Sequence, residues 1–325
     1  MMNAIRTTFL LAALTALFVA IGYVVGGQTG MLIALAIAAA MNILAYWNSD
    51  RIVLRLQGAQ EVSRQRAPDL HDLVADLARA AGIPMPKVYL INAEQPNAFA
   101  TGRDPQNAAV AVSTGLLSHL DRDEIAGVLA HELAHIRSRD TLIMTVTATL
   151  AGAISVLAQF GLFFGARNSN SGIGPIGGLL LIILAPIAAT IVQLAVSRTR
   201  EYEADRDAAE ITGDPMALAS ALDKISRLAK HFENPWARRS PGMAHLYIVN
   251  PLSGRGADNL FSTHPDVRNR IAQLQEIAHA MTPTRHVAGR TRLTREGEPP
   301  RRPTSGWRVP DIGTAADTRG AGPWG

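Results

Sequence analysis

The chain begins with a long stretch of apolar residues. The 43 positions between Arg6 and Asp50 hold no charged side chain, about twice the roughly 20 residues that a helix needs to cross a bilayer. Gly26–Gly30 breaks the stretch near its middle. We therefore expect residues 1–49 to form a transmembrane hairpin of two helices.

The first span of this hairpin is expected near Thr8–Val25 and the second near Met31–Trp47. Tyr23, Tyr46 and Trp47 lie near the span ends, where amphipathic rings favour the membrane interface. A cleaved signal peptide is the alternative for the first span. The length of the apolar run, and the second run that follows at once, argue against it.

A second pair of apolar runs follows later in the chain. Thr141–Ala166 and Asn168–Ser197 contain no charged residue, and Arg167 separates them. Length and lack of charge favour a second transmembrane hairpin over residues 141–197. A buried hairpin inside a large soluble core is the alternative.

Basic residues next to the spans predict the orientation of the protein. The turn between the first two spans has none, whereas the flanking segments hold several. Positive charge favours the cytoplasmic side, so we expect a multi-pass protein of the inner or plasma membrane with its large polar segments in the cytoplasm. The residues used for this assignment are Arg6, Arg51, Arg55, Arg64 and Arg66.

The polar segments, residues 50–140 and 198–282, are expected to form one cytoplasmic domain. Helical spacing of apolar residues predicts a helix over Pro68–Ala81, which Gly82 would end. Residues rich in β-formers predict three short strands. These strands are Lys87–Asn92, Asn97–Thr101 and Ala108–Ser113.

Four further helices are predicted in the two polar segments. Asp121–Arg139 has an Asp at its start and Glu124 three positions later, the pattern of a capping box. A helix that contains Glu201 should end at Gly213, and Asp214-Pro215 should start the next one. A last helix should cover Asn259–Ala280. The fold class is thus α+β, mainly helical, with a small sheet and membrane spans.

The amino-acid composition excludes several kinds of functional site. The chain has no cysteine, which excludes disulfides, thiolate metal sites and a cysteine nucleophile. The net charge of +4 resides in residues 283–325, where eight Arg face four acidic residues. The folded part therefore has no excess of positive charge, and we expect no nucleic-acid partner. The tail lacks periodic apolar residues and is expected to be disordered.

The strongest chemical signal is an HExxH motif on the Asp121–Arg139 helix. His131 and His135 are four positions apart, so both imidazoles lie on one helix face and can reach a single ion. Glu132 is rotated away from that direction by the helix repeat. It could then act as general base on a water molecule without binding the metal.

A catalytic zinc site usually has a third protein ligand, and Glu201 is the best candidate. Asp205 lies four positions later on the same face, where it could hydrogen-bond an imidazole and orient it. The alternative is a solvated helix start, in which these acids pair with nearby arginines. Spacing alone does not decide between the two.

Several motifs together resemble the HtpX family of membrane zinc endopeptidases, relatives of the CAAX prenyl endopeptidases. The resemblance covers most of residues 50–280. It implies one Zn²⁺ per chain held by His131, His135 and Glu201, with Asp205 as a supporting residue. It also implies four membrane spans, a cytoplasmic active site and quality control of membrane proteins. The motifs are PNAFATG, VAVSTGLL, LAHELAH, SRTREYEAD and FSTHP.

Two further features bear on substrate. The strand that contains Asn97 and Ala98 could bind an extended peptide along its edge, although ordinary sheet packing is the alternative. His264, before Pro265, could donate a hydrogen bond to the developing oxyanion, a role that the resemblance supports. A polar residue at the start of a helix is the alternative for His264.

The sequence therefore predicts a zinc endopeptidase that cleaves misfolded or membrane proteins at the lipid surface. A membrane scaffold with a structural zinc is one alternative, but such a site would not need Glu132. A small transporter is another, but the spans carry no ionisable residue in their interiors.

Overall fold

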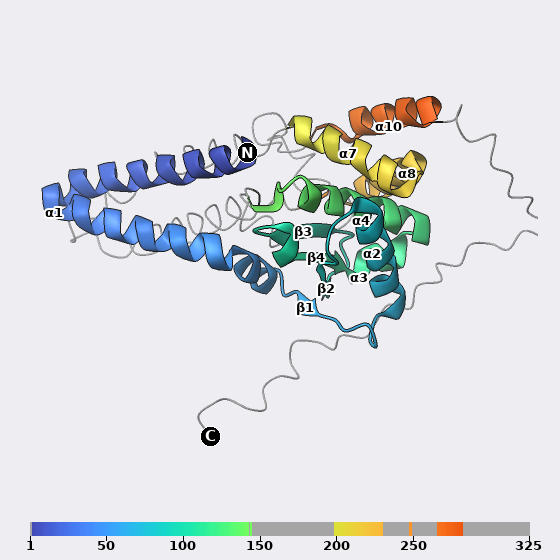
Figure 1. The fold of residues 1–325 in the computed structure, drawn as a ribbon, viewed down its shortest axis with the longest axis horizontal. Coiled ribbons are helices and arrows are strands. Elements are labelled where there is room, and N and C mark those ends of the chain that lie inside the picture. Colours follow the sequence, from blue (N-terminus) through green and yellow to red (C-terminus); the bar gives the residue numbers. More distant parts are fainter. Residues whose placement is uncertain (1, 143, 145–197, 230–246, 249–264, 282–325) are drawn as a thin grey trace, which may run out of the picture.

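The computed structural model describes residues 2–142, 144, 198–229, 247–248 and 265–281 (Figure 1). Within this part of the chain, a long helical hairpin projects from a body in which helices cover a small sheet. Three predictions lie outside the described residues. They are the second hairpin apart from its first residues, His264, and the tail 283–325.

The hairpin is helix α1 (Met2–Leu56), which is kinked at Gly26 and Gly27. Gly27 has φ 58°, a conformation that costs glycine little. The break is narrower than the predicted Gly26–Gly30. The arms are linked by a 2.8 Å hydrogen bond from the side-chain amide of Asn42 to the hydroxyl of Thr15.

The second arm of α1 also runs farther than predicted. The expected span ended at Trp47, but the helix continues to Leu56. The reason is packing, because Val53 and Leu54 are buried against the sheet together with Phe99. The helix thus joins the projecting hairpin directly to the body of the protein.

Most of the second arm presents apolar side chains to the outside. Within the described residues, Gly26–Asn48 is the one helix long and apolar enough to cross a membrane. Only 6% of the most apolar 18-residue stretch of this helix is buried. Large exposed side chains on this arm include Leu32, Ile33, Ile37, Ile43, Leu44 and Trp47.

The sheet has four strands in the order β1-β2-β4-β3. Strands β2 and β4 are parallel, whereas the two outer pairs, β1 with β2 and β3 with β4, are antiparallel. The mixed sheet thus leaves β3 at one edge, beside the HExxH helix. The strands are β1 (Gln60–Glu61), β2 (Lys87–Ile91), β3 (Ala98–Gly102) and β4 (Ala108–Ser113).

Both faces of the sheet are covered, and side chains alternate between them as a two-residue repeat requires. One set, exemplified by Leu90 and Val110, packs in the main helical core. The other set, exemplified by Phe99 and Ala111, packs against the end of α1. Every residue of β3 and β4 is therefore buried, which fixes the register of the edge strand.

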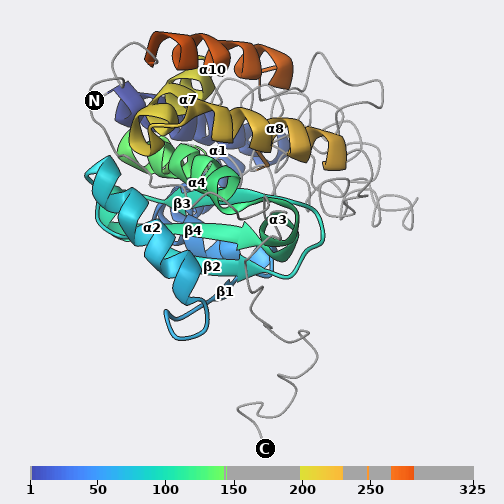
Figure 2. The same cartoon turned by 90° about the vertical axis from the view of Figure 1, so that its right-hand side faces the viewer.

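The main core is formed by helices stacked on one face of the sheet (Figure 2). Helix α4 lies next to the sheet and contacts α2, α7 and α8, while α10 covers α7 and α8 from above. Gly127 lets α4 approach the backbone of Leu218 in α8 closely. These helices are α2 (Pro68–Ala81), α4 (Arg122–Arg137), α7 (Arg198–Thr212), α8 (Pro215–Ala229) and α10 (Val267–Met281).

Most local predictions are confirmed, and one helix start is wrong. Both bonds of the predicted capping box are present, since Asp121 and Glu124 each accept a hydrogen bond from the other's backbone N–H. The predicted continuous helix over Asn259–Ala280 is wrong, because Pro265 and Asp266 are not helical and α10 begins at Val267. The Asp266 side chain instead accepts from the N–H of Arg268 and caps α10. Short helices η1 (Pro105–Asn107) and α3 (Thr114–His119) were not predicted.

Candidate metal centre

The two histidines of the HExxH motif face the same way from α4. His131 and His135 are each only 2% exposed, and their Nε2 atoms lie 3.3 Å apart. Their rings meet at 87° with centroids 4.8 Å apart. The helix spacing predicted from the sequence thus brings the two imidazole nitrogens together in the protein interior.

Glu201 reaches the same point from the neighbouring helix α7. One carboxylate oxygen lies 3.6 Å from Nε2 of His131, and the other lies 3.6 Å from Nε2 of His135. Ligand atoms of these three residues all lie within 4.8 Å of one another. Glu201 is 1% exposed, so the solvated helix start considered as an alternative does not describe this residue.

The spacing of these atoms fits a metal ion. Two atoms bound tetrahedrally to zinc at ~2.0–2.1 Å lie roughly 3.3–3.4 Å apart. The observed separations, 3.3 Å between the imidazoles and 3.6 Å to the carboxylate, are close to this value. By contrast, 3.6 Å is too long for a direct hydrogen bond between Glu201 and either histidine.

The charges around the three ligands also fit a cation. Among the described residues, four buried carboxyl groups and two buried guanidinium groups surround the imidazoles. The carboxyl groups outnumber the guanidinium groups, an imbalance that a cation would offset. The carboxyl groups belong to Glu132, Asp140, Glu201 and Asp205, and the guanidinium groups to Arg200 and Arg270.

The same surroundings attract positive charge to His131. Burial and the charge of Arg270 act to lower the pKa of His131, but Asp205 and Glu201 outweigh them and raise it to about 9. The carboxylates around His131 therefore favour positive charge at this ring. A metal ion bound to His131 would have to compete with a proton.

Glu132 points to a different partner from the histidines. Its carboxylate accepts a 2.7 Å hydrogen bond from the backbone N–H of Ala100 in β3, and the residue is 5% exposed. Burial raises the pKa of the Glu132 carboxyl, and its electrostatic interactions with His131 and His135 offset this only in part. The candidate general base is thus held between the metal-ligand helix and the edge strand.

Asp205 lies behind His131, as the four-residue spacing suggested. Its Oδ1 is 3.0 Å from Nδ1 of His131, on the ring nitrogen opposite the side that faces Glu201. Burial acts to raise the pKa of Asp205, but the charge of Arg270 and hydrogen bonds hold it below its usual range. An ionised carboxylate in this position orients the imidazole.

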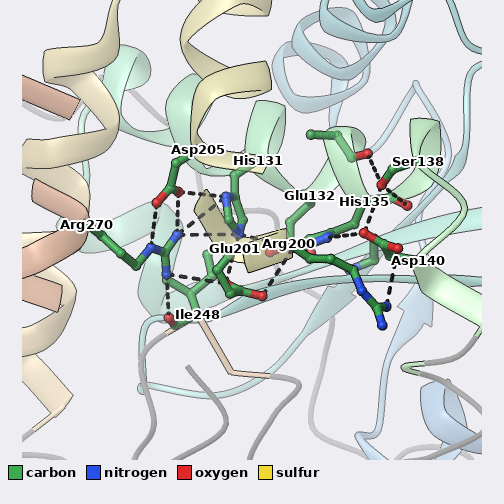
Figure 3. A network of polar contacts seen from close by, with 12 residues as sticks. His131, Glu132, His135, Ser138, Asp140, Arg200, Glu201, Asp205, Ile248 and Arg270 are labelled. Carbon is green, nitrogen blue, oxygen red and sulfur yellow. Dashed lines mark hydrogen bonds and ion pairs between the residues drawn. The ribbon is translucent and has the colours of Figure 1, made fainter. Parts of the chain in front are cut away.

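Arg270, which the sequence analysis missed, holds Asp205 with two hydrogen bonds (Figure 3). Its Nε donates to Oδ2 at 2.8 Å, and its Nη2 donates to Oδ1 at 2.6 Å. Arg270 is completely buried and also donates to the carbonyl of Ile248 at 3.3 Å. Helix α10 thereby becomes part of the site.

The residues predicted to contact substrate lie beside the site rather than in it. Asn97 is 5% exposed, and its side-chain oxygen accepts a hydrogen bond from the N–H of Ile248 at 3.2 Å. Ala98 is fully buried in β3, opposite Val112. The main chain of Ala98 is thus covered as well as its side chain.

A buried helix with two histidines, a carboxylate from a second helix and an adjacent glutamate define a metallopeptidase site. The model of peptidase family M48 matches residues 64–278, a range that includes all the described side chains of the site. The chain belongs to peptidase family M48, a family of metalloproteases. The resemblance noted in the sequence is confirmed at the level of the family.

The chain is also similar to a solved structure. The crystal structure of Ste24p from S. mikatae is similar with a TM-score of 0.46 and 18% sequence identity. The similarity covers 84% of this chain and 65% of that one. The chain thus spans slightly less than two thirds of the length of that protein.

Proposed function

We propose that the protein is a zinc-dependent endopeptidase. The observation that carries the proposal is the buried triangle of His131, His135 and Glu201, with Glu132 adjacent on the same helix. We assign the three triangle residues as ligands of one Zn²⁺. Nitrogen and oxygen donors at these separations suit zinc, which binds imidazole and carboxylate tetrahedrally.

The chain's own residues supply the proton transfers of peptide hydrolysis. Bound zinc would polarise the substrate carbonyl as a Lewis acid. Glu132 would take a proton from the attacking water and return it to the nitrogen of the leaving amine. The hydrogen bond from Ala100 holds the Glu132 carboxylate in place for both transfers.

We assign substrate binding to the outer edge of β3. The N–H of Ala100 points to Glu132 and not to β4, and main-chain groups of alternate residues point the same way. The main chain of Ala98 is therefore directed to the same edge, where a peptide that displaced the groups covering Ala98 could add as a strand. Asn97 would support this edge by tying it to Ile248.

His264 completes the proposal as a donor to the oxyanion. It lies outside the described residues, but it immediately precedes Pro265 in the chain. Pro265 is buried just before α10, the helix that carries Arg270 into the site. An imidazole at this point in the chain could approach the reacting carbonyl, where donors aimed at the developing charge contribute most.

We further propose that the peptidase is a multi-pass membrane protein whose site faces the cytoplasm. The exposed apolar arm of α1 supports insertion, because soluble proteins rarely expose so large an apolar surface. Tyr46 and Trp47 lie at its inner end, followed by Arg51 and Arg55, as at a cytoplasmic interface. The natural substrates would be misfolded or membrane proteins.

Purified full-length protein tests the activity. With zinc, the wild type is expected to cleave an unfolded protein such as casein. Glu132→Gln should abolish cleavage yet retain about one zinc per chain. Metal retained by the wild type without cleavage of any unfolded membrane protein would instead favour the scaffold with a structural zinc.

Cells test the substrate class. Membrane proteins are expected to accumulate in cells that carry Glu132→Gln, compared with cells that carry the wild type, in quantitative proteomics. Accumulation of soluble proteins alone would contradict the assignment to membrane substrates.

Cysteine labelling of single-cysteine variants in intact cells would test the orientation of the protein in the membrane. The experiment is simple because the chain has no native cysteine.

A further inference from the structure

The second imidazole of the site, His135, has a buried nitrogen that faces away from the metal triangle. Its Nδ1 makes no hydrogen bond to any of the described residues. The nearest acceptor is Oδ2 of Asp140, at 3.6 Å. This distance is about 0.6 Å longer than an ordinary N–H···O hydrogen bond. Asp140 itself is 3% exposed, so a charged group lies buried directly behind the ring (Figure 3).

The turn that ends α4 places Asp140 there. Arg139 adopts φ 59°, and the N–H of Asp140 returns to the carbonyl of His135 at 2.9 Å. The N–H of Arg139 bonds the carbonyl of Ile136 at 3.1 Å. This pair of bonds is a Schellman motif, in which glycine normally takes the left-handed position. Arg139 is the non-glycine residue with positive φ in the described part of the chain, at a cost on the order of 1 kcal/mol.

Two groups hold the Asp140 carboxylate in this position. The hydroxyl of Ser138 donates to Oδ2 at 3.0 Å, and Nη1 of Arg200 donates to Oδ1 at 3.3 Å. Arg200 is 7% exposed and comes from α7, one residue before Glu201. The Asp140–Arg200 pair therefore links the end of the HExxH helix to the start of the helix that supplies the third ligand.

A similar but tighter arrangement lies behind His131. There, Asp205 faces Nδ1 of the imidazole, and the buried Arg270 holds Asp205. Behind His135, Asp140 faces Nδ1, and the buried Arg200 holds Asp140. Each imidazole thus has its own carboxylate, and each carboxylate has its own guanidinium group.

We propose that Asp140, held by Arg200, is the positioning residue of His135. With a metal bound at Nε2, Asp140 would close the 3.6 Å gap and accept the Nδ1–H of the ring, which makes Nε2 a stronger ligand. The inference rests on the proposed function, since it takes His135 Nε2 as a metal ligand. It adds Asp140 and Arg200 to the site through an interaction that the HExxH motif does not contain.

The first test is metal affinity, measured by competition with a chromogenic chelator. Asp140→Ala is expected to weaken zinc binding by about 10–100-fold, the range for loss of such a partner. Asp140→Asn should weaken it less, because an amide oxygen can still accept a hydrogen bond. Arg200→Gln should fall between these variants and the wild type.

The matched control is Asp207→Asn. Arg137 and Asp207 form a 2.6 Å ion pair that also joins α4 to α7 but contacts none of the three ligands. If Asp140–Arg200 only held the two helices together, loss of the control pair would weaken metal binding equally. We expect Asp207→Asn to bind zinc within about threefold of the wild type.

The second test is the visible absorption spectrum of the cobalt-substituted full-length protein. A changed ligand orientation should shift or weaken the cobalt bands in Asp140→Ala and Arg200→Gln, but not in Asp207→Asn. If Asp140→Ala does not fold, Asp140→Asn and Arg200→Gln still decide the question by affinity and spectrum. Wild-type affinity and spectrum in both would overturn the proposal.

Failure of this inference and failure of the proposed function give different results. A wild type that binds no metal would defeat both. A wild type that binds zinc and cleaves casein, together with an Asp140→Ala variant of unchanged affinity, would defeat the role of Asp140 alone.

Discussion

Replacing Arg270 by methionine removes a charge that has no exposed surface. The guanidinium donates two hydrogen bonds to Asp205, at 2.6 and 2.8 Å, and one to the Ile248 carbonyl at 3.3 Å. Methionine retains much of the volume, so the cavity left behind is small. The main effect is that the Asp205 carboxylate remains buried without its cation.

The expected loss of stability is about 3–5 kcal/mol, the cost of breaking a buried ion pair by removing one partner. A folded unit of this size loses roughly 2–4 °C of Tm per kcal/mol. The Tm of Arg270→Met should therefore lie about 6–20 °C below that of the wild type. Because Asp205 also orients His131, the comparison is best made with both proteins freed of metal.

Differential scanning of full-length protein in detergent would measure the effect. Arg268→Met is the matched control, because Arg268 lies on the same helix two positions earlier and is exposed. We expect Asp205→Asn to cost much less in the Arg270→Met background than in the wild type, as coupled partners do. The reasoning fails if Arg270→Met lowers Tm no more than the control does, or if the two substitutions are simply additive.

Three further predictions concern pH, packing and metal. Burial acts to raise the pKa of Glu124, but hydrogen bonds from Lys224 and Ser220 hold it below 4.5. This carboxylate therefore stabilises the folded state above about pH 4.5, and the contribution is lost as pH falls through the lower folded pKa. The Tm gap between wild type and Glu124→Gln should accordingly shrink from pH 7 to pH 3, and a constant gap would contradict the assignment. In Gly127→Ala the new methyl would lie 2.8 Å from the backbone nitrogen of Leu218. The resulting overpacking costs about 1–3 kcal/mol and should lower Tm, although alanine favours the helix more than glycine does. A raised Tm would show that α4 and α8 are not in close contact. Chelation should lower the Tm of the wild type by linkage but hardly that of Glu201→Gln, and an equal drop in both would exclude this ligand.

Local signals in the sequence predicted much of the fold. Helix α2 begins at a proline and ends before Gly82, whose φ of 68° closes the helix, and both limits could be read from the chain. The capping box at Asp121 likewise depends only on residues three apart. Such features are set within one turn of chain, so no knowledge of distant contacts is needed.

Features that depend on distant contacts were not predicted. The parallel pairing of β2 with β4, with β3 on the outside, depends on how helices cover both faces of the sheet. The continuation of α1 to Leu56 depends on apolar contacts of Val53 with the sheet. Neither arrangement leaves a periodic signal in the sequence.

The site was predicted in part for the same reason. His131 and His135 share one helix turn, so their meeting follows from the helix repeat. Arg270 could have been found, because it lies four positions before the buried Leu274 on the apolar stripe of its helix. Asp140 was harder to predict from the sequence. The turn that brings it back to His135 has Arg139 at the left-handed position, where a glycine would have indicated the end of the helix.

The division of the proposed metal ligands between α4 and α7 has a consequence for synthesis of the chain. The ribosome makes His131 and His135 well before Glu201, and it adds roughly 5–20 residues per second. For several seconds the nascent protein thus carries the histidine pair without its carboxylate, and a chain halted in this interval should bind zinc far more weakly in a chelator competition. With the proposed ligands, a peptidase assembled in this order would stay inert on the ribosome and gain its activity only once most of its own sequence has been translated.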